Sequence, residues 1–196
     1  MTRTATRSRS TSETTIELSI DLDGSGVTDV STGIPFFDHM LDQLGRHGGF
    51  DLMVRATGDL HVDGHHTVED VGITLGEVFR EALGDKAGIR RFASGLYPLD
   101  EALVEVALDL SGRPFTAYDV PFGEVLPLGD PPFNPEMAEH FWQSFATAAG
   151  ITLHVRLREG RNTHHIVEAC FKGVSRCLRD AVRIEGEGIP STKGSI

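Results

Sequence analysis

The stretch "DGHHTVED", residues 63–70, contains the pattern His-His-x-x-Glu, and "RNTHHIVEA", residues 161–169, contains it again. After each copy, apolar residues recur at helical spacing. They are Val68, Val71, Leu75, Val78, Phe79, Ala82 and Leu83 in the first stretch, and Val167, Cys170, Val174, Cys177, Leu178, Ala181 and Val182 in the second. The two copies therefore predict two matching amphipathic helices, each beginning with a pair of histidines.

The same order of elements precedes each of these helices: a strand with a tight turn, a helix and a second strand. The predicted stretches are 14–26, 36–48 and 50–58 in the first half, and 100–114, 137–150 and 151–160 in the second. In this alignment Glu13 matches Glu101, and His39 matches His140. Agreement in order, turns and histidines indicates an internal duplication, with half-repeats 13–95 and 96–186.

The predicted fold class is α+β, because each half gives strands first and then helix–strand–helix. Each half-domain is expected to be a mostly antiparallel sheet covered by two helices. Residues 1–12 are basic and rich in serine and threonine, so we expect a mobile tail there. Residues 187–196 form a second tail, and the insertion 119–136, with five of the nine prolines, predicts an irregular loop.

Composition excludes several classes of function. The net charge of −11 argues against nucleic acid as a partner. The sequence contains no run of about 18 apolar residues, so we expect no membrane span. The start of the chain lacks the apolar segment of a secretory signal. Cys170 and Cys177 would lie two turns apart on one helix, too distant for a disulfide. They indicate core thiols in a reducing, cytoplasmic compartment.

The histidine pairs indicate metal sites. Neighbouring side chains on a helix point about 100° apart, so the two histidines of a pair do not easily coordinate the same ion. The glutamate lies three and four residues after them, so it can share an ion with either histidine. With one further histidine on each preceding helix, the candidate ligands are His39, His65, His66, Glu69, His140, His164, His165 and Glu168. The pseudo-twofold then gives each of two metals three histidines and one glutamate.

Which ligands belong together stays open at this point. One symmetric division groups His39, His66 and Glu69 with His164, and His140, His165 and Glu168 with His65. Both halves of a site could also come from different chains. Mixed imidazole and carboxylate ligands suit Mn²⁺, Fe²⁺ or Zn²⁺. Four protein ligands with open positions favour an octahedral ion, so we expect manganese, two ions per chain.

Three alternatives compete with separated metal sites. In a dinuclear hydrolase, shared carboxylates hold two ions about 3.5–4 Å apart, but only two carboxylates accompany six histidines here. A metal-storage protein would need neither phosphate-binding residues nor open coordination positions. The histidines could also be exposed residues at ordinary helix starts, although two copies in register argue against this.

Five motifs carry a resemblance to a known family: "STGIPFFDHMLDQLGRHGGFDL", "GDLHVDGHHTVEDVGITLGE", "LDEALVEVALDLSGRP", "RNTHHIVEACFKGVSRCLRDA" and "IPSTKGSI". Over residues 9–196 the chain resembles imidazoleglycerol-phosphate dehydratases of the monofunctional form. The resemblance implies a duplicated, ribosomal protein S5 domain 2-like fold, two manganese ions, and a homo-oligomer of twenty-four subunits with active sites formed between subunits. It also implies dehydration of D-erythro-imidazoleglycerol phosphate to imidazoleacetol phosphate in histidine biosynthesis.

The chemistry of that reaction explains the need for two metals. The hydrogen to be removed lies on a carbon without an adjacent carbonyl, so direct abstraction would be slow. Two metals at the ring nitrogens can hold the ring as imidazolate, which expels the neighbouring hydroxide to give a diazafulvene. A general base then removes the proton. The resemblance points to Glu13 as that base, with Asp100 or a metal-bound hydroxide as the alternatives.

The resemblance also assigns the residues that bind the phosphorylated substrate. The phosphate needs cations and hydrogen-bond donors. The family pattern carries over to Arg91, Arg113, Lys172, Ser191 and Lys193. Gln43 is expected to bind a substrate hydroxyl or the phosphate. The tail 187–196 thereby becomes a phosphate-binding tail.

Overall fold

The computed structural model describes residues 3–123, 126–194 and 196. Its two halves contain the same elements in the same order. The first half has β1 (Thr4–Ser10), β2 (Thr14–Asp21), β3 (Thr28–Ser31), α1 (Pro35–Gly48), β4 (Asp51–Gly58) and α2 (His65–Leu83). The second has β5 (Phe92–Leu99), β6 (Ala102–Asp109), β7 (Phe115–Asp119), α3 (Met137–Ala149), β8 (Thr152–Glu159) and α4 (Thr163–Ala181).

The two sheets have the same topology, with strand orders β1-β2-β4-β3 and β5-β6-β8-β7. Two of the three strand pairs in each sheet are antiparallel, and the edge pairs β3–β4 and β7–β8 are parallel. This arrangement confirms the predicted α+β class and the duplication. The short edge strands β3 and β7 were not predicted, because four or five residues carry too little alternation to identify them.

Alternating burial decides which face of each sheet meets the helices. In β2, the side chains of Ile16, Leu18 and Ile20 are buried, while the residues between them face outward. Helices α1 and α3 end where Gly49 and Gly150 adopt left-handed backbone, each with φ of 69°. Glycine is the residue that takes this conformation without strain, so both helices stop at matching places.

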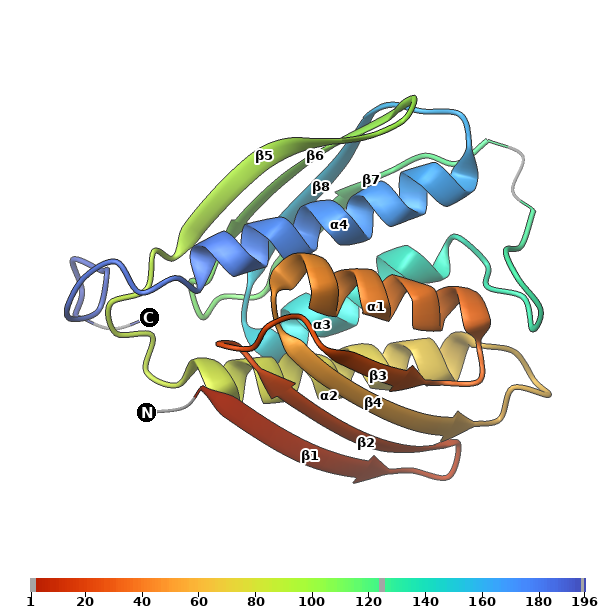
Figure 1. Cartoon of the computed structure of the whole chain (residues 1–196), viewed down its shortest axis with the longest axis horizontal. Coiled ribbons are helices and arrows are strands. Elements are labelled where there is room, and N and C mark those ends of the chain that lie inside the picture. Colours follow the sequence, from red (N-terminus) through yellow and green to blue (C-terminus); the bar gives the residue numbers. More distant parts are fainter. Residues whose placement is uncertain (1–2, 124–125, 195) are drawn as a thin grey trace.

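The four helices lie between the two sheets (Figure 1). Helix α2 covers β1 and β2, and α4 covers β5 and β6, so each sheet is covered from its own half. In the middle of the molecule each helix packs against a helix of the other half: α1 against α4, and α2 against α3. Aromatic rings join these layers, with centroids 5.6 Å apart for Phe79 and Phe145 and 5.3 Å apart for Phe141 and Phe171.

The structure corrects the predicted boundaries. Residues 4–10, expected within a mobile tail, form strand β1 and pair with β2 from Thr4 opposite Asp21 to Ser10 opposite Thr15. Arg7 and Arg9 are bound by acidic residues of α2, and this ties the basic segment down. Because β5 is the counterpart of β1, the second repeat begins at Phe92, and the predicted boundary at 95/96 falls inside a strand.

The segment between β7 and α3 is irregular, as predicted. In its described residues, 120–123 and 126–136, the structure has only an isolated bridge between Leu128 and Phe133. None of the helices in the described ranges has the length and apolar character needed to cross a membrane. Both cysteines are free thiols and buried, as predicted for core thiols.

The contact between α2 and α3 gives a test of the packing. A methyl group on Gly76 would lie 2.5 Å from the carbonyl oxygen of Phe145 and 2.7 Å from Cβ of Ala148. Gly76→Ala should therefore destabilise the protein by about 1–3 kcal/mol from overpacking, even though alanine favours a helix over glycine by about 1 kcal/mol. Gly186→Ala is the control, because among the described residues no atom beyond its chain neighbours lies within 4 Å of its added methyl group. Equal melting temperatures for the two variants at one protein concentration would contradict the close helix approach.

Candidate active site

A first cluster of metal-ligating side chains lies where α1 meets α4. His39 comes from α1, and His164 and Glu168 are one turn apart on α4. The Nε2 atoms of His164 and His39 lie 3.0 and 3.5 Å from Oε2 of Glu168. One ligand atom from each residue lies within 4.8 Å of the others. Oε1 of Glu168 accepts from Nζ of Lys172 at 2.6 Å, so the second oxygen faces both histidines.

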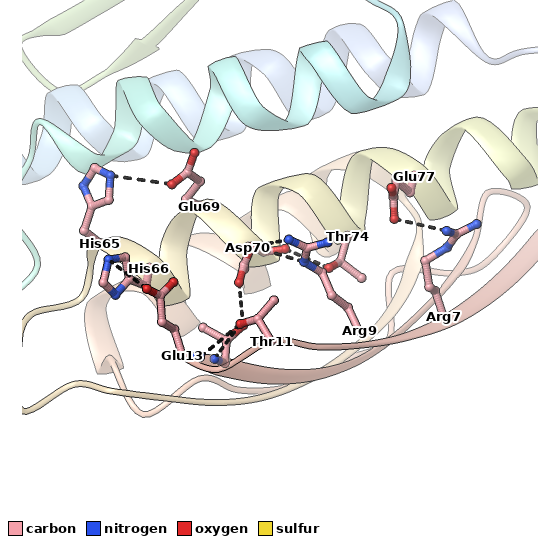
Figure 2. Close-up of polar contacts among 11 residues, drawn as sticks. Arg7, Arg9, Thr11, Glu13, His65, His66, Glu69, Asp70, Thr74 and Glu77 are labelled. Atoms are coloured by element: carbon pink, nitrogen blue, oxygen red, sulfur yellow. Dashed lines mark hydrogen bonds and ion pairs between the residues drawn. The ribbon is translucent and has the colours of Figure 1, made fainter.

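A second cluster occupies the pseudo-symmetric position where α2 meets α3. The rings of His65 on α2 and His140 on α3 have centroids 4.8 Å apart. Nε2 of His65 lies 3.7 Å from Oε2 of Glu69, one turn along the same helix (Figure 2). Each cluster thus combines one histidine from one half of the chain with a histidine–glutamate pair from the other half.

The ligand division differs from the symmetric grouping suggested by sequence. His39 does lie with His164, and His65 with His140, but the glutamates are exchanged. Glu168 accompanies His39, and Glu69 accompanies His65. The reason is that a histidine and a glutamate four residues apart share one helix face, and that face meets a helix from the opposite half.

The other histidine of each pair, His66 and His165, points away from both clusters. Nδ1 of His66 lies 3.0 Å from Oδ2 of Asp59, and its Nε2 lies 3.9 Å from Oε1 of Glu13. His165 has a matching environment. Its Nδ1 lies 2.7 Å from Oε2 of Glu101, and its Nε2 lies 3.7 Å from Oδ2 of Asp100.

These contacts change the correspondence between the acids of the two halves. By sequence Glu13 matches Glu101, but by position Glu13 matches Asp100, since both face Nε2 of an outward histidine. Glu101 matches Asp59 in position, since each binds Nδ1. Asp59 was missed because it comes directly after β4, and the residue directly after the matching strand β8 is Gly160, so the repeat offers no acid at that position. Its position at a strand end shortly before a histidine pair was the available signal.

The hydrogen bonds between His165 and Glu101, and between His66 and Asp59, shift the pKa values of these groups. The hydrogen bond from His165, followed by that from the backbone N–H of Asn162, lowers the pKa of Glu101 to about 2. In turn, the hydrogen bond to Glu101 raises the pKa of His165, and Asp59 raises the pKa of His66 in the same way. An imidazole that donates from Nδ1 to a carboxylate keeps Nε2 available as a ligand when it is neutral.

Glu168 is the most buried acid of the clusters, at 9% exposure. Burial alone raises the pKa of its carboxyl group, but the hydrogen bond and charge of Lys172, with His164 and His39, more than offset this. The pKa of Glu168 therefore lies below its ordinary value. The residue is a carboxylate facing two imidazoles, which is the form that binds a cation.

The residues assigned to the phosphate lie in two places. Arg91, Arg113, Ser191 and Lys193 line one open cavity together with the C-terminal residue. Arg91 is fixed there, because it donates to Asp109 at 2.6 and 3.0 Å and to the carbonyl oxygen of Pro190 at 2.8 Å. Gln43 and Lys172 lie instead at the first histidine cluster.

Contacts within the first cluster place these two residues. Nε2 of Gln43 lies 3.4 Å from Nδ1 of His39, and Lys172 binds Glu168. Within one chain, the structure therefore joins four of the six predicted substrate-binding residues in one cavity. The other two lie beside the first histidine–glutamate cluster.

Comparison with known proteins identifies the family. A model of the imidazoleglycerol-phosphate dehydratase family matches residues 32–178. The chain belongs to the imidazoleglycerol-phosphate dehydratase family. These enzymes are hydro-lyases of histidine biosynthesis. The enzyme of this name from Granulibacter bethesdensis is 56% identical over 199 residues, covering 100% of both chains. That from Methanopyrus kandleri is 53% identical over 194 residues, covering 99% of this chain and 96% of its own.

Solved structures of the family share the fold. The imidazoleglycerol-phosphate dehydratase of Pyrococcus furiosus, in complex with (S)-C348, matches with a TM-score of 0.83 and 36% identity, covering 97% of this chain and 100% of that one. The Staphylococcus aureus enzyme matches with a TM-score of 0.81 and 33% identity, covering 91% and 97%. The similarity thus spans both half-repeats and not one of them alone.

The pair formed by Glu101 and His165 predicts a measurable titration. The carboxylate contributes stability above the ordinary pKa of 4.5, and the imidazolium contributes stability below the ordinary pKa of 6.5. The pair therefore stabilises the metal-free protein most between these values, and less as pH falls toward 2 or rises above the raised pKa of His165. Glu101→Gln should lower the pKa of His165 toward 6.5, as measured by NMR of ¹⁵N-histidine. Asp59→Asn is the control, because the Asp59 side chain bonds to His66 and not to His165. An unchanged His165 titration in Glu101→Gln would contradict the assignment.

Proposed function

We propose that this chain dehydrates D-erythro-imidazoleglycerol phosphate to imidazoleacetol phosphate in histidine biosynthesis. Similarity over the whole length to enzymes of that name supports the proposal. The observation that carries it is the pair of histidine–glutamate clusters related by the internal repeat. An imidazole ring has two nitrogens on opposite sides, and a substrate of that shape calls for two similar binding positions.

The two clusters are the proposed sites of two manganese ions per chain. The donor set of each, two imidazoles and one carboxylate, fits a divalent ion that accepts mixed nitrogen and oxygen ligands. The buried Glu168 carboxylate, aimed at two imidazole nitrogens, supports a cation there. When bound, the two ions would act as Lewis acids toward the two ring nitrogens of the substrate.

His66 and His165 complete the ligand sets in the proposed assembly. Each faces away from the clusters of its own chain, and each is held at Nδ1 by a carboxylate. We infer that these histidines supply the fourth protein ligand to clusters of neighbouring subunits. This places active sites between subunits of a homo-oligomer, for which the family resemblance implies twenty-four copies. The buried free thiols of Cys170 and Cys177 support a reducing, cytoplasmic setting.

The substrate's phosphate is proposed to bind in the cavity of Arg91, Arg113, Ser191 and Lys193. In a chain of net charge −11, cations gathered in one place give a local attraction for an anion. Guanidinium groups also match the geometry of phosphate oxygens. Gln43 and Lys172 lie beside the first cluster. There they could bind a hydroxyl group or the phosphate of a substrate that is shared with a neighbouring chain.

Glu13 is the proposed general base. Its side chain is half exposed and lies 3.9 Å from His66, an outward histidine. Loss of hydroxide from the carbon next to the ring leaves a diazafulvene, whose adjacent C–H is acidic. Glu13 takes that proton, and the resulting enol becomes the ketone. Asp100, at the matching position beside His165, is the second candidate.

Metal content tests the two clusters separately. Wild-type protein loaded with manganese should hold two ions per chain, and His39→Ala and His140→Ala should each hold about one, because each removes a ligand from a different cluster. His154→Ala should retain two, since that residue lies on β8 against Phe115. Elemental analysis of the purified variants makes the measurement. A wild-type value of one ion per chain would remove the two-cluster interpretation.

The role of Glu13 is tested by separating turnover from metal binding. Glu13→Gln keeps the side-chain shape and removes the proton acceptor, so it should hold two metals while kcat falls about 10²–10⁴-fold. Glu69→Gln should instead lose metal and activity together. The assay is ketone formation from imidazoleglycerol phosphate by the manganese-loaded protein.

Each outcome of this assay has a distinct meaning. No turnover by the wild-type protein would refute the proposed reaction. Near-normal kcat in Glu13→Gln would move the base to another group, with Asp100→Asn as the next variant to measure. Loss of metal in Glu13→Gln would show that the acids are wrongly divided between ligands and base.

A further inference from the structure

We propose that Asp70 is a positioning residue, which with Thr14 and Arg9 fixes the β1–β2 hairpin and so holds Glu13 beside the metal-ligand helix. The inference rests on the proposed role of Glu13 as base. It concerns a buried charged group that belongs to neither the histidine clusters nor the phosphate cavity. None of the residues in this network was predicted from sequence.

Asp70 is buried on α2, with 8% exposure, and both its oxygens are bonded. Oδ2 accepts a hydrogen bond from Oγ1 of Thr14 at 2.5 Å. Oδ1 accepts from Nε and Nη2 of Arg9 at 3.1 and 2.9 Å (Figure 2). Thr14 begins β2 and Arg9 lies near the end of β1. One carboxylate on α2 therefore forms hydrogen bonds with both strands of the hairpin, next to its turn.

The turn held in this way carries Glu13. Oγ1 of Thr11 accepts from the backbone N–H groups of Glu13 and Thr14 at 3.1 and 3.0 Å. Glu13 is the residue directly before Thr14. On α2, Asp70 lies one turn after His66, and residues four apart share one face of a helix. The same face thus anchors the hairpin and carries the imidazole that Glu13 approaches.

The second half of the chain builds the same hairpin without this network. Matching the strands by register places Tyr97 where Arg9 lies, since Arg9 pairs with Ile16 and Tyr97 with Val104. The counterparts of Thr14 and Asp70 are Ala102 and Ala169, each 1% exposed. A buried carboxylate is costly unless it is fully bonded. Because the fold forms with two alanines in the repeat, the network in the first half serves a purpose beyond folding.

The two hairpins differ in what their acids do. In the second half Glu101 accepts from the backbone N–H groups of Asn162 and Arg161, at 2.7 and 3.2 Å, and from His165. Its carboxylate thereby fixes the hairpin and is occupied. Within the described ranges, the carboxylate of Glu13 accepts no hydrogen bond, and its nearest ion-pair partner is His66 at 3.9 Å. Thr14 and Asp70 supply the anchor, which leaves Glu13 available to take a proton.

The test is the double substitution Thr14→Ala and Asp70→Ala, which gives the first half the residues that the second half has at these positions, Ala102 and Ala169. In the metal-loaded enzyme, kcat should fall about 10- to 100-fold, because misplacement by about 1 Å costs this much. KM and metal content should stay near wild type. Arg7→Met is the matched control, since Arg7 also joins β1 to α2, through Glu77 and Glu81 at 3.2 Å, without touching the turn. Unchanged kcat in the double variant would overturn the proposal.

A thermodynamic cycle with Glu13→Gln identifies the residue through which the network acts. If Asp70 acts through Glu13, adding the double substitution to Glu13→Gln should cause no further loss of kcat. Losses that multiply would overturn the proposal. If the double variant folds poorly, Thr14→Val replaces it, because this change removes only the hydroxyl group and leaves Arg9 bonded to Asp70.

Hydrogen exchange separates failure of this inference from failure of the proposed reaction. The backbone amides of residues 11–14 should exchange faster in the double variant than in Arg7→Met, whether or not the substrate is turned over. Equal exchange in both variants would overturn the anchoring itself. Faster exchange together with normal kinetics in Glu13→Gln would show that the hairpin is anchored but that Glu13 is not the base, which also overturns the positioning role.

Discussion

The packing of helices from opposite halves is the contact on which the site depends. Because α1 lies against α4, and α2 against α3, each cluster takes its ligands from both repeats. The close approach at Gly76 and the aromatic pairs between the halves, Phe79 with Phe145 and Phe37 with Phe141, hold these helices at fixed spacing. A half-repeat on its own would carry a histidine–glutamate pair without the histidine that completes it. The duplication therefore creates two similar sites only when both halves fold together.

Helix geometry then divides each histidine pair. Residues four apart face the same side, so His65 stays with Glu69 and His164 with Glu168, while the adjacent histidine turns toward the hairpin of its own half. Asp59 after β4, or Glu101 in the second hairpin, binds Nδ1 of that histidine, and a hairpin acid lies near its Nε2. The acids of the two halves differ, because among the described residues the carboxylate of Glu13 accepts no hydrogen bond and only approaches His66, whereas Glu101 accepts hydrogen bonds from Asn162 and His165. This difference distinguishes a proposed base from a structural acid.

Much of this arrangement could be predicted from sequence. Strong helical and alternating patterns identified α1, α2, α3, α4, β2, β4, β6 and β8. The repeated His-His-x-x-Glu gave six candidate ligands, and the matching histidines on the two preceding helices, His39 and His140, gave the other two. Strand β1 was missed because its basic, hydroxyl-rich composition is typical of a mobile tail. Its arginines are held by acidic residues of α2, which are distant in sequence. The grouping of Glu69 and Glu168 with their histidines, and the contacts of Asp59 and Asp70, depend on helix packing and on residues distant in sequence. Local periodicity carries no information about these contacts.

The central claim is that each chain offers inward ligands to its own clusters and outward histidines to its neighbours. Coexpression of two variants tests it most directly. One variant carries His39→Ala and His140→Ala, and the other carries His66→Ala and His165→Ala, so neither alone can complete a site. Distinct tags confirm that mixed particles form. The account predicts that mixed particles recover part of the metal content and turnover, since inward ligands of one chain meet outward histidines of the other. Mixed particles without activity, or a fully active His66→Ala and His165→Ala variant, would contradict it.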